Sequence, residues 1–110
     1  MPKANKDVLQ GTLDLLILKT LALQPLHGWG IAMRIQDISK NALDVGQGSI
    51  YPALVRLQNQ GFVSDYWDLT ENNRRARYYQ LTRLGRRQLE AETASWRRYA
   101  AAIELILGTS

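Results

Sequence analysis

The sequence contains no cysteine and only one histidine, His27. A chain without cysteine can form neither a disulfide framework nor a thiolate zinc site. A single histidine excludes the paired-histidine metal motifs and leaves little scope for histidine-based catalysis. The carboxylates are scattered along the chain, and no nucleophile is paired with a base in the sequence. We therefore expect a protein that is not an enzyme and that needs no metal or other cofactor.

Long apolar runs are absent as well. A membrane-spanning helix needs about 18 or more apolar residues in a row, but the longest candidate, residues 13–23, is interrupted by Asp14, Lys19 and Thr20. The N-terminal residues, MPKANKD, are polar and lack the apolar segment of a signal peptide. These two absences predict a cytoplasmic protein that does not enter a membrane.

Charge is unevenly distributed along the chain. The 110 residues, about the length of one domain, carry a net charge of +4. Eight arginines lie between Arg74 and Arg98, where only Glu90 and Glu92 oppose them, so this span alone carries about +6. A planar guanidinium group can bond two oxygens of a phosphate or a carboxylate at once. The span therefore indicates anion recognition, and a solvated helix face is the alternative interpretation.

Apolar periodicity predicts two helices in the first part of the chain. Residues 8–23 have the wide apolar face of a buried helix, and Pro25 stops its continuation. Residues 28–39 follow, with isoleucines stacked on one side. Two glycines in the first turn of this second helix indicate close packing against a neighbour. We expect His27, which precedes this helix, to act as a cap or a packing residue.

A third helix is predicted within residues 48–61, GSIYPALVRLQNQG. Ser49 has the hydroxyl group that favours an N-cap, which places Pro52 in the first turn, where proline loses no hydrogen bond. The core-facing side comprises Ile50, Leu54 and Leu57. The opposite side comprises Pro52, Val55, Arg56 and Asn59, with Tyr51 at its edge. Gly61 supplies the left-handed residue that ends the helix.

After the third helix the apolar period changes from about 3.6 to about 2 residues. Residues 62–69 and 75–81 are rich in aromatic side chains and are predicted to form the two strands of a hairpin. Asn72 and Asn73 tolerate the turn conformations that must join them. The tip and second strand carry Arg74, Arg75 and Arg77.

A final helix is predicted over residues 83–107, capped by Thr82 and about 37 Å long. Its apolar face includes Leu89, Trp96 and Ile103, which recur every seven residues. Because such a helix would extend beyond so small a domain, we expect a two-fold dimer in which it packs on its counterpart and on the first helix of the partner. The expected interface residues are Val8, Thr12, Leu15, Leu89, Trp96 and Ile103.

Three helices, a basic hairpin and a long helix, in this order, resemble the winged helix-turn-helix arrangement, and the chain resembles the PadR family of bacterial transcription regulators. The matching stretches are GTLDLLIL at 11–18, HGWGI at 27–31, GSIYPALVRL at 48–57 and ARYYQLTRLGRRQLE at 76–90. The resemblance implies a mainly α-helical fold with a small β-hairpin. A winged helix-turn-helix domain would occupy residues 1–81, and a C-terminal dimerisation helix residues 82–110.

The resemblance also implies that the third helix enters the major groove of DNA while the hairpin lies along the backbone. The expected DNA-binding residues are Ser49, Tyr51, Pro52, Arg56, Asn59, Asn73, Arg74, Arg75 and Arg77. Arg56 can pair with guanine or with a phosphate, or remain solvated, and Tyr51 can instead pack at the core edge against the hairpin. At Val55 the chain has an apolar residue where the family often has a polar one, which affects base preference rather than fold.

Two interpretations of Trp96 remain open. It can be interface core, or, as the resemblance implies, it can line a pore near the dimer axis that takes flat aromatic compounds as effectors. The leading hypothesis is thus a nucleoid-associated dimeric repressor, released by a small aromatic effector, that binds a palindromic operator in double-stranded DNA. The alternative is a winged-helix module that binds protein and has no specific affinity for DNA.

Overall fold

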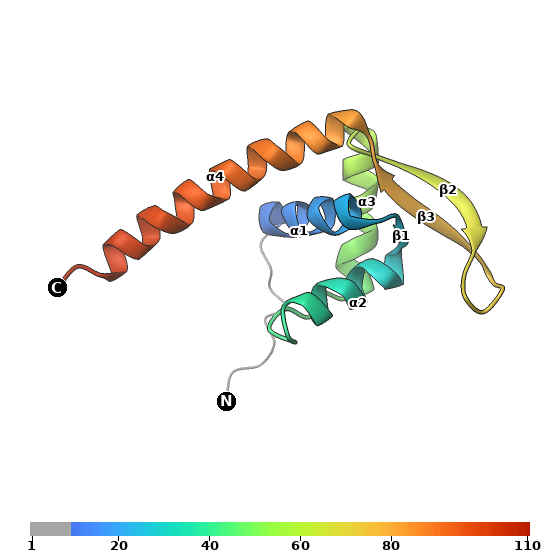
Figure 1. The fold of residues 1–110 in the computed structure, drawn as a ribbon, viewed down its shortest axis with the longest axis horizontal. Helices are drawn as coiled ribbons and strands as arrows, with labels where there is room; N and C mark the ends of the chain where they lie inside the picture. Colours follow the sequence, from blue (N-terminus) through green and yellow to red (C-terminus); the bar gives the residue numbers. More distant parts are fainter. Residues whose placement is uncertain (1–9) are drawn as a thin grey trace.

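The computed structural model describes residues 10–110. Its elements are, in order, α1 (Gln10–Leu23), β1 (Leu26–His27), α2 (Gly28–Ile38), α3 (Gln47–Asn59), β2 (Val63–Leu69), β3 (Arg75–Leu81) and α4 (Arg83–Leu107). The first three helices gather around one core, the β2–β3 hairpin extends from one side, and α4 passes α1 and continues beyond it (Figure 1). This arrangement confirms the predicted winged helix-turn-helix fold with a long C-terminal helix. Val8, one of the expected interface residues, lies outside the described residues.

The core is formed by the inner faces of the first three helices. From α1 it takes Leu13, Ile17, Leu18 and Leu21; from α2, Ile31 and Ile35; from α3, Ile50, Ala53, Leu54 and Leu57. The predicted inner face of α3 is therefore confirmed. Thr20 is buried on α1 and donates its hydroxyl to the Leu16 carbonyl at 2.7 Å, so that its one polar group is satisfied.

The start of α2 is fixed by His27, whose Nδ1 accepts a hydrogen bond from the Gly30 amide at 2.9 Å. The prediction that His27 acts as a cap is confirmed. Gly28 is buried, and a Cβ atom at this position would lie 2.8 Å from the Tyr51 ring. The close packing expected from the glycines of this turn is therefore, at Gly28, between the α2 backbone and a side chain of α3, whereas a Cβ atom at Gly30 would lie 3.2 Å from the His27 ring.

The prediction that Ser49 caps α3 was wrong. The helix begins earlier, at Gln47, after the extended residue Gly46, and the Gly46 N-cap makes no side-chain cap hydrogen bond in the described part of the chain. The amides of Ser49 and Ile50 both donate to the Gly46 carbonyl, at 3.0 and 3.2 Å, so Ser49 lies within the first turn. Pro52 consequently lies inside the helix. Because proline has no amide hydrogen, the Gly48 carbonyl loses its usual partner four residues along the chain.

The sheet contains the predicted hairpin and one strand that the sequence did not reveal. Strands β2 and β3 pair antiparallel from Val63↔Leu81 to Leu69↔Arg75, and Asn73 in the connecting loop has a left-handed φ of 61°. The short strand β1 adds to the other edge of β3, with Leu26 opposite Tyr79. This pairing attaches the hairpin, which we call the wing, to the helical core.

Helix α4 is anchored at its first turn. Thr82 accepts from the Gly85 amide at 3.0 Å, as predicted, and donates its hydroxyl to the Gly61 carbonyl at 2.6 Å. Gly61 itself has a left-handed φ of 82°, which confirms the predicted end of α3. Leu89 packs against the core, whereas Leu105, Ile106 and Leu107 are more than 70% exposed. No helix within residues 10–110 has the length and apolarity needed to cross a membrane.

Candidate nucleic-acid interface

One row of residues forms the outermost surface of α3. Its members are spaced four, three and four residues apart, which brings them to one side of a helix. They are Gly48, Pro52, Val55 and Asn59, and we call them the outer ridge. All four are exposed, as was predicted for the last three. The inner side of the same helix is fully buried, so α3 presents this ridge to the surroundings without distortion of the core.

Arg56 lies on the flank of α3 that faces α1. Its Nη2 atom donates to Oδ1 of Asp14 at 2.8 Å, and its side chain is 35% exposed. Its Nε atom is buried and has no hydrogen-bond partner among residues 10–110. The structure therefore holds Arg56 in an ion pair between two helices, an arrangement that none of the alternatives considered from the sequence included.

Two further residues expected at DNA differ in their surroundings. The Tyr51 ring packs on Gly28 at the start of α2, although 45% of the residue remains exposed. Ser49 is exposed in the first turn of α3. Its hydroxyl is therefore accessible, and it is not engaged as a cap.

The wing arginines are organised by Trp67, a residue that the sequence did not single out. The guanidinium carbons of Arg75 and Arg77 lie 4.8 and 5.1 Å from the centre of its ring. Trp67 is opposite Arg77 in the β2–β3 register, so the three side chains share one face of the hairpin. Arg77 also forms an ion pair with Asp65, with 3.0 Å between Nε and Oδ2. We call this cluster of Trp67, Arg75 and Arg77 the Trp67 platform. The sequence contained a signal for it, namely a tryptophan in one strand and alternate arginines in the next.

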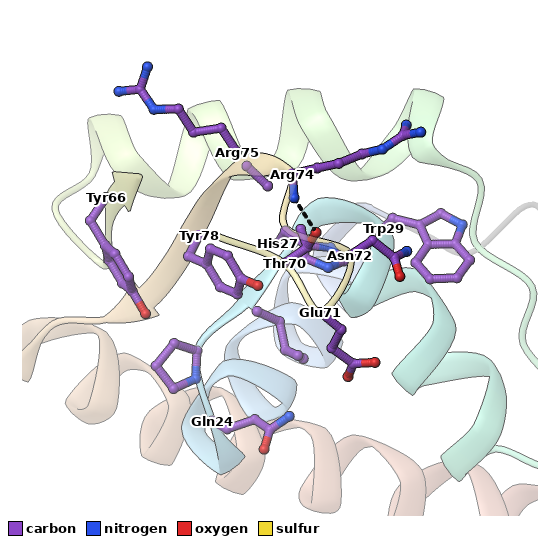
Figure 2. A pocket seen from close by; sticks show the side chains of 13 residues that line it. Gln24, His27, Trp29, Tyr66, Thr70, Glu71, Asn72, Arg74, Arg75 and Tyr78 are labelled. Carbon is purple, nitrogen blue, oxygen red and sulfur yellow. Dashed lines mark hydrogen bonds between the residues drawn. The ribbon is translucent and has the colours of Figure 1, made fainter. Parts of the chain in front are cut away.

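Arg74 lies in the loop at the tip of the wing. The loop is closed by two hydrogen bonds between the same residues: the Arg74 amide donates to the Thr70 hydroxyl at 3.2 Å, and the Thr70 amide donates to the Arg74 carbonyl at 2.8 Å. Asn73 supplies the left-handed residue that this turn requires. The turn thereby projects the Arg74 side chain away from the body of the wing (Figure 2).

A cleft of about 820 Å³ separates the wing loop from β1 and the start of α2. Its aromatic wall consists of His27, Trp29, Tyr66 and Tyr78 (Figure 2). The rings contact one another: His27 lies edge-on to Tyr78 at 5.3 Å between centroids, and Tyr66 stacks on Tyr78 at 5.8 Å. Such contacts favour a fixed orientation of the wing on the core. Arg74 and Arg75 also line this cleft, and the outer end of the Arg75 side chain extends away from the aromatic rings (Figure 2).

A second groove, of about 410 Å³, lies between α1 and α4. Its walls include Thr12 and Leu15 from α1 and Trp96 and Tyr99 from α4, whose rings are 6.2 Å apart. The structure thus brings three of the expected interface residues together within one protomer. Ile103 lies farther along α4 and is 36% exposed. Within residues 10–110, no cluster of three histidine or carboxylate side chains could hold a metal ion.

Comparison with known proteins agrees with this geometry. Residues 17–91, well over half of the chain, match the family described as "Transcriptional regulator PadR-like family". A PadR family transcriptional regulator from Eggerthella lenta has a TM-score of 0.78 and 27% identity, with 92% of this chain and 86% of that chain covered. A transcriptional regulator from Clostridium thermocellum has a TM-score of 0.80 at 24% identity, covering 91% and 94% of the two chains.

A relative by sequence is an uncharacterised 37.1 kDa protein in transposon TN4556 of Streptomyces fradiae. It is 37% identical over 90 residues, which are 82% of this chain but only 24% of that protein. The chain therefore spans about a quarter of the length of this relative.

Proposed function

The chain belongs to the PadR-like family of transcriptional regulators, and we propose that it works as a homodimeric repressor that binds a palindromic operator in double-stranded DNA. Family membership makes it a DNA-binding regulator rather than an enzyme. We further propose that it acts in the cytoplasm, at the nucleoid.

The observation that carries this proposal is the outer ridge of α3. Glycine, proline and asparagine occupy one exposed row of this helix, with the proline inside it. Because these residues disfavour a helix, packing in the core alone does not account for them. In winged helix-turn-helix proteins the corresponding helix enters the major groove. We therefore assign α3 as the recognition helix, with Tyr51 and Ser49 on the two sides of its outer ridge.

The wing would contact the DNA backbone through Arg74, Arg75 and Arg77, with Asn73 shaping the turn. Trp67 holds two of these guanidinium groups over its ring, which reduces the conformational entropy that they would lose on binding phosphate. Arginine also presents a fork of donors that fits a phosphate. The wing is thus suited to fixing the protein's position on DNA rather than to reading the bases.

The dimer would form through α4. The helix is 25 residues long and therefore extends about 37 Å, and its distal half leaves Ile103 and the apolar residues 105–107 exposed. A partner helix and the partner's α1 would cover these side chains. A two-fold dimer would then place two recognition helices about 34–36 Å apart, one turn of DNA.

An effector site would lie in the α1–α4 groove. Trp96 and Tyr99 offer two ring faces there, with Leu15 opposite, and a flat aromatic compound would stack on them. Burial of Trp96 within the dimer interface is the alternative. Saturable quenching of tryptophan fluorescence by planar aromatic compounds, lost in Trp96→Ala, would support the effector site. The absence of binding across a varied set of such compounds would exclude it.

DNase footprinting on the region upstream of the protein's own gene tests the proposed function. We expect protection of a palindrome and clear preference over a random duplex. Affinity should fall by about 10³ or more between 50 and 200 mM salt if six phosphates are contacted. A triple variant with Arg74, Arg75 and Arg77 changed to alanine should bind much more weakly. Unchanged DNA binding by this variant would instead favour a winged-helix module that binds protein.

A further inference from the structure

The side chains at the centre of the outer ridge are purely hydrocarbon. Pro52 and Val55 occupy its middle, between Gly48 and Asn59, and Val55 is 54% exposed. Neither side chain has a hydrogen-bond donor or acceptor. Hydrogen-bonded reading of base edges in the major groove instead uses side chains such as arginine, asparagine and glutamine.

Apart from Asn59 at the end of the outer ridge, the polar side chains expected at DNA lie on the flanks of α3. Arg56, its only charged residue, is bound by Asp14 at 2.8 Å. The Tyr51 ring packs on Gly28. By helical geometry the side chains of Ser49 and Arg56 on one flank, and Tyr51 on the other, lie about 70–90° around the axis from the ridge. The part of the helix that penetrates deepest is therefore apolar.

A major groove offers one apolar feature that such a surface can recognise, the C5-methyl group of thymine. Every other base edge there presents donors or acceptors, and covering these with proline or valine would remove their water without replacing its hydrogen bonds. Gly48 assists close approach, because it has no side chain and no atom of the described residues lies within 4 Å of the position that a Cβ would take.

We propose that α3 reads thymine through its 5-methyl groups, with Val55 as the specificity-determining contact and Pro52 beside it. The inference rests on the proposed function, namely that α3 enters the major groove. It assigns an A·T pair with thymine toward Val55 in each half-site. Asp14 acts as a positioning residue, because it keeps the Arg56 guanidinium from the guanine edge that would otherwise attract it.

The DNA probe is obtained by selecting, from a random pool, the duplexes that the full-length protein binds. The enriched duplex is then synthesised with deoxyuridine in place of thymidine at one protected position at a time, which removes only the methyl group. We expect dissociation constants to rise about fourfold for each contacted methyl, and about fifteenfold for a symmetric pair. Deoxyuridine at thymines outside the protected half-sites is the control and should change nothing.

Two protein variants test whether Val55 is the residue that senses the thymine methyl group. In Val55→Ala the ratio of the dissociation constants for the deoxyuridine and thymidine duplexes should fall close to one, whereas Val55→Ile should preserve this ratio. Both substitutions are at an exposed position, and circular dichroism melting should confirm that both variants fold. A ratio that stays unchanged in Val55→Ala would overturn the assignment.

The selection experiment distinguishes a failure of the proposed function from a failure of the thymine-methyl inference. If no duplex is enriched over the random pool, the proposed function fails and this inference fails with it. If a duplex is enriched but deoxyuridine is neutral at every protected thymine, the proposed function stands and only the thymine-methyl inference is overturned.

Discussion

Arg56 on α3 donates to Asp14 on α1 across 2.8 Å, and these residues are 42 positions apart in the sequence. The Asp14 side chain is only 19% exposed, so the ion pair is partly removed from water. The ion pair connects α3, the proposed recognition helix, to α1. The residue after Asp14 on α1, Leu15, lines the groove beside Trp96. The side chain that the sequence made the best candidate for a guanine contact is thus part of the packing between two helices.

Replacement of Arg56 by alanine should therefore affect stability more than DNA binding. We expect the free energy of unfolding to fall by about 1–2 kcal/mol, because Asp14 is left largely buried without its partner. The slope of DNA affinity against salt should stay the same, since no phosphate contact is lost. Urea unfolding and fluorescence anisotropy measure the two effects. Arg34→Ala, at an exposed position on α2, is the matched control and should leave stability within about 0.5 kcal/mol. A salt slope reduced by about one would mean that Arg56 does reach a phosphate.

A glycine-to-alanine substitution should have opposite effects on stability at Gly48 and at Gly85. A Cβ atom at Gly48 would have no neighbour within 4 Å, and alanine is a better helix former by up to about 1 kcal/mol. Gly48→Ala should thus raise the melting temperature. It should nevertheless weaken DNA binding by about tenfold if the ridge approaches the bases closely, since the added methyl costs about 1–3 kcal/mol of overpacking. Unchanged affinity in this well-folded variant would place the Gly48 backbone away from the DNA.

Gly85→Ala, in contrast, should destabilise the protein strongly. A Cβ atom there would lie 2.0 Å from the Phe62 carbonyl oxygen, closer than any real contact. Relief requires the start of α4 to move away from the backbone between α3 and β2, and we expect a loss of about 3 kcal/mol or more. Thermal unfolding followed by circular dichroism would measure it. A melting temperature within a few degrees of the parent protein would show that α4 can shift at little cost.

Tyr79 should make the protein sensitive to alkaline pH. Burial raises the pKa of its hydroxyl group above the ordinary value of 10.0, and the neighbouring Arg77 opposes this shift. Because the folded pKa is the higher one, the unfolded chain loses the proton first as pH rises. The contribution to stability is complete below pH 10 and is lost as the pH rises from there through the folded pKa. Urea unfolding between about pH 8 and 11 should therefore show a decline that Tyr79→Phe reduces. The exposed Tyr99 provides the control, and Tyr99→Phe should retain the decline in full.

The helices and the wing could be predicted because each contains enough residues to display a period. Residues 62–69 and 75–81 alternate in the manner of strands, and the structure places β2 and β3 within one residue of these bounds. The caps at His27 and Thr82 follow from local side-chain chemistry, so they too could be predicted. Strand β1 has only two residues, too few to display any period.

The remaining differences between the prediction and the structure have two causes: competition between two possible starts of α3, and tertiary contacts between elements. Ser49 is a preferred cap, but the extended Gly46 allows the chain to enter the helix one turn sooner, and no local rule decides between them. The Arg56–Asp14 pair depends on how α1 crosses α3. The Trp67 platform depends on the hairpin register. Local sequence patterns specify neither how two helices cross nor which residues of two strands lie opposite each other.

The last prediction concerns the proposed dimer and uses two positions of α4. Ile103 lies on the same side of the helix as Trp96 and Leu89, whereas Ala101 lies roughly 160° around the axis from Ile103, and both are exposed in the single chain. An aspartate at Ile103 would place a charge within the apolar contact between two α4 helices, where desolvation costs several kcal/mol. We therefore expect Ile103→Asp to sediment as a monomer at micromolar concentration, while Ala101→Asp remains a dimer with the same added charge. The monomeric variant should also bind a single half-site as well as a whole palindrome, because it can no longer gain from two linked recognition helices. If both variants sediment alike as dimers, the association does not run through this face of α4; if the parent protein is itself a monomer, the dimeric mode of operator recognition is excluded.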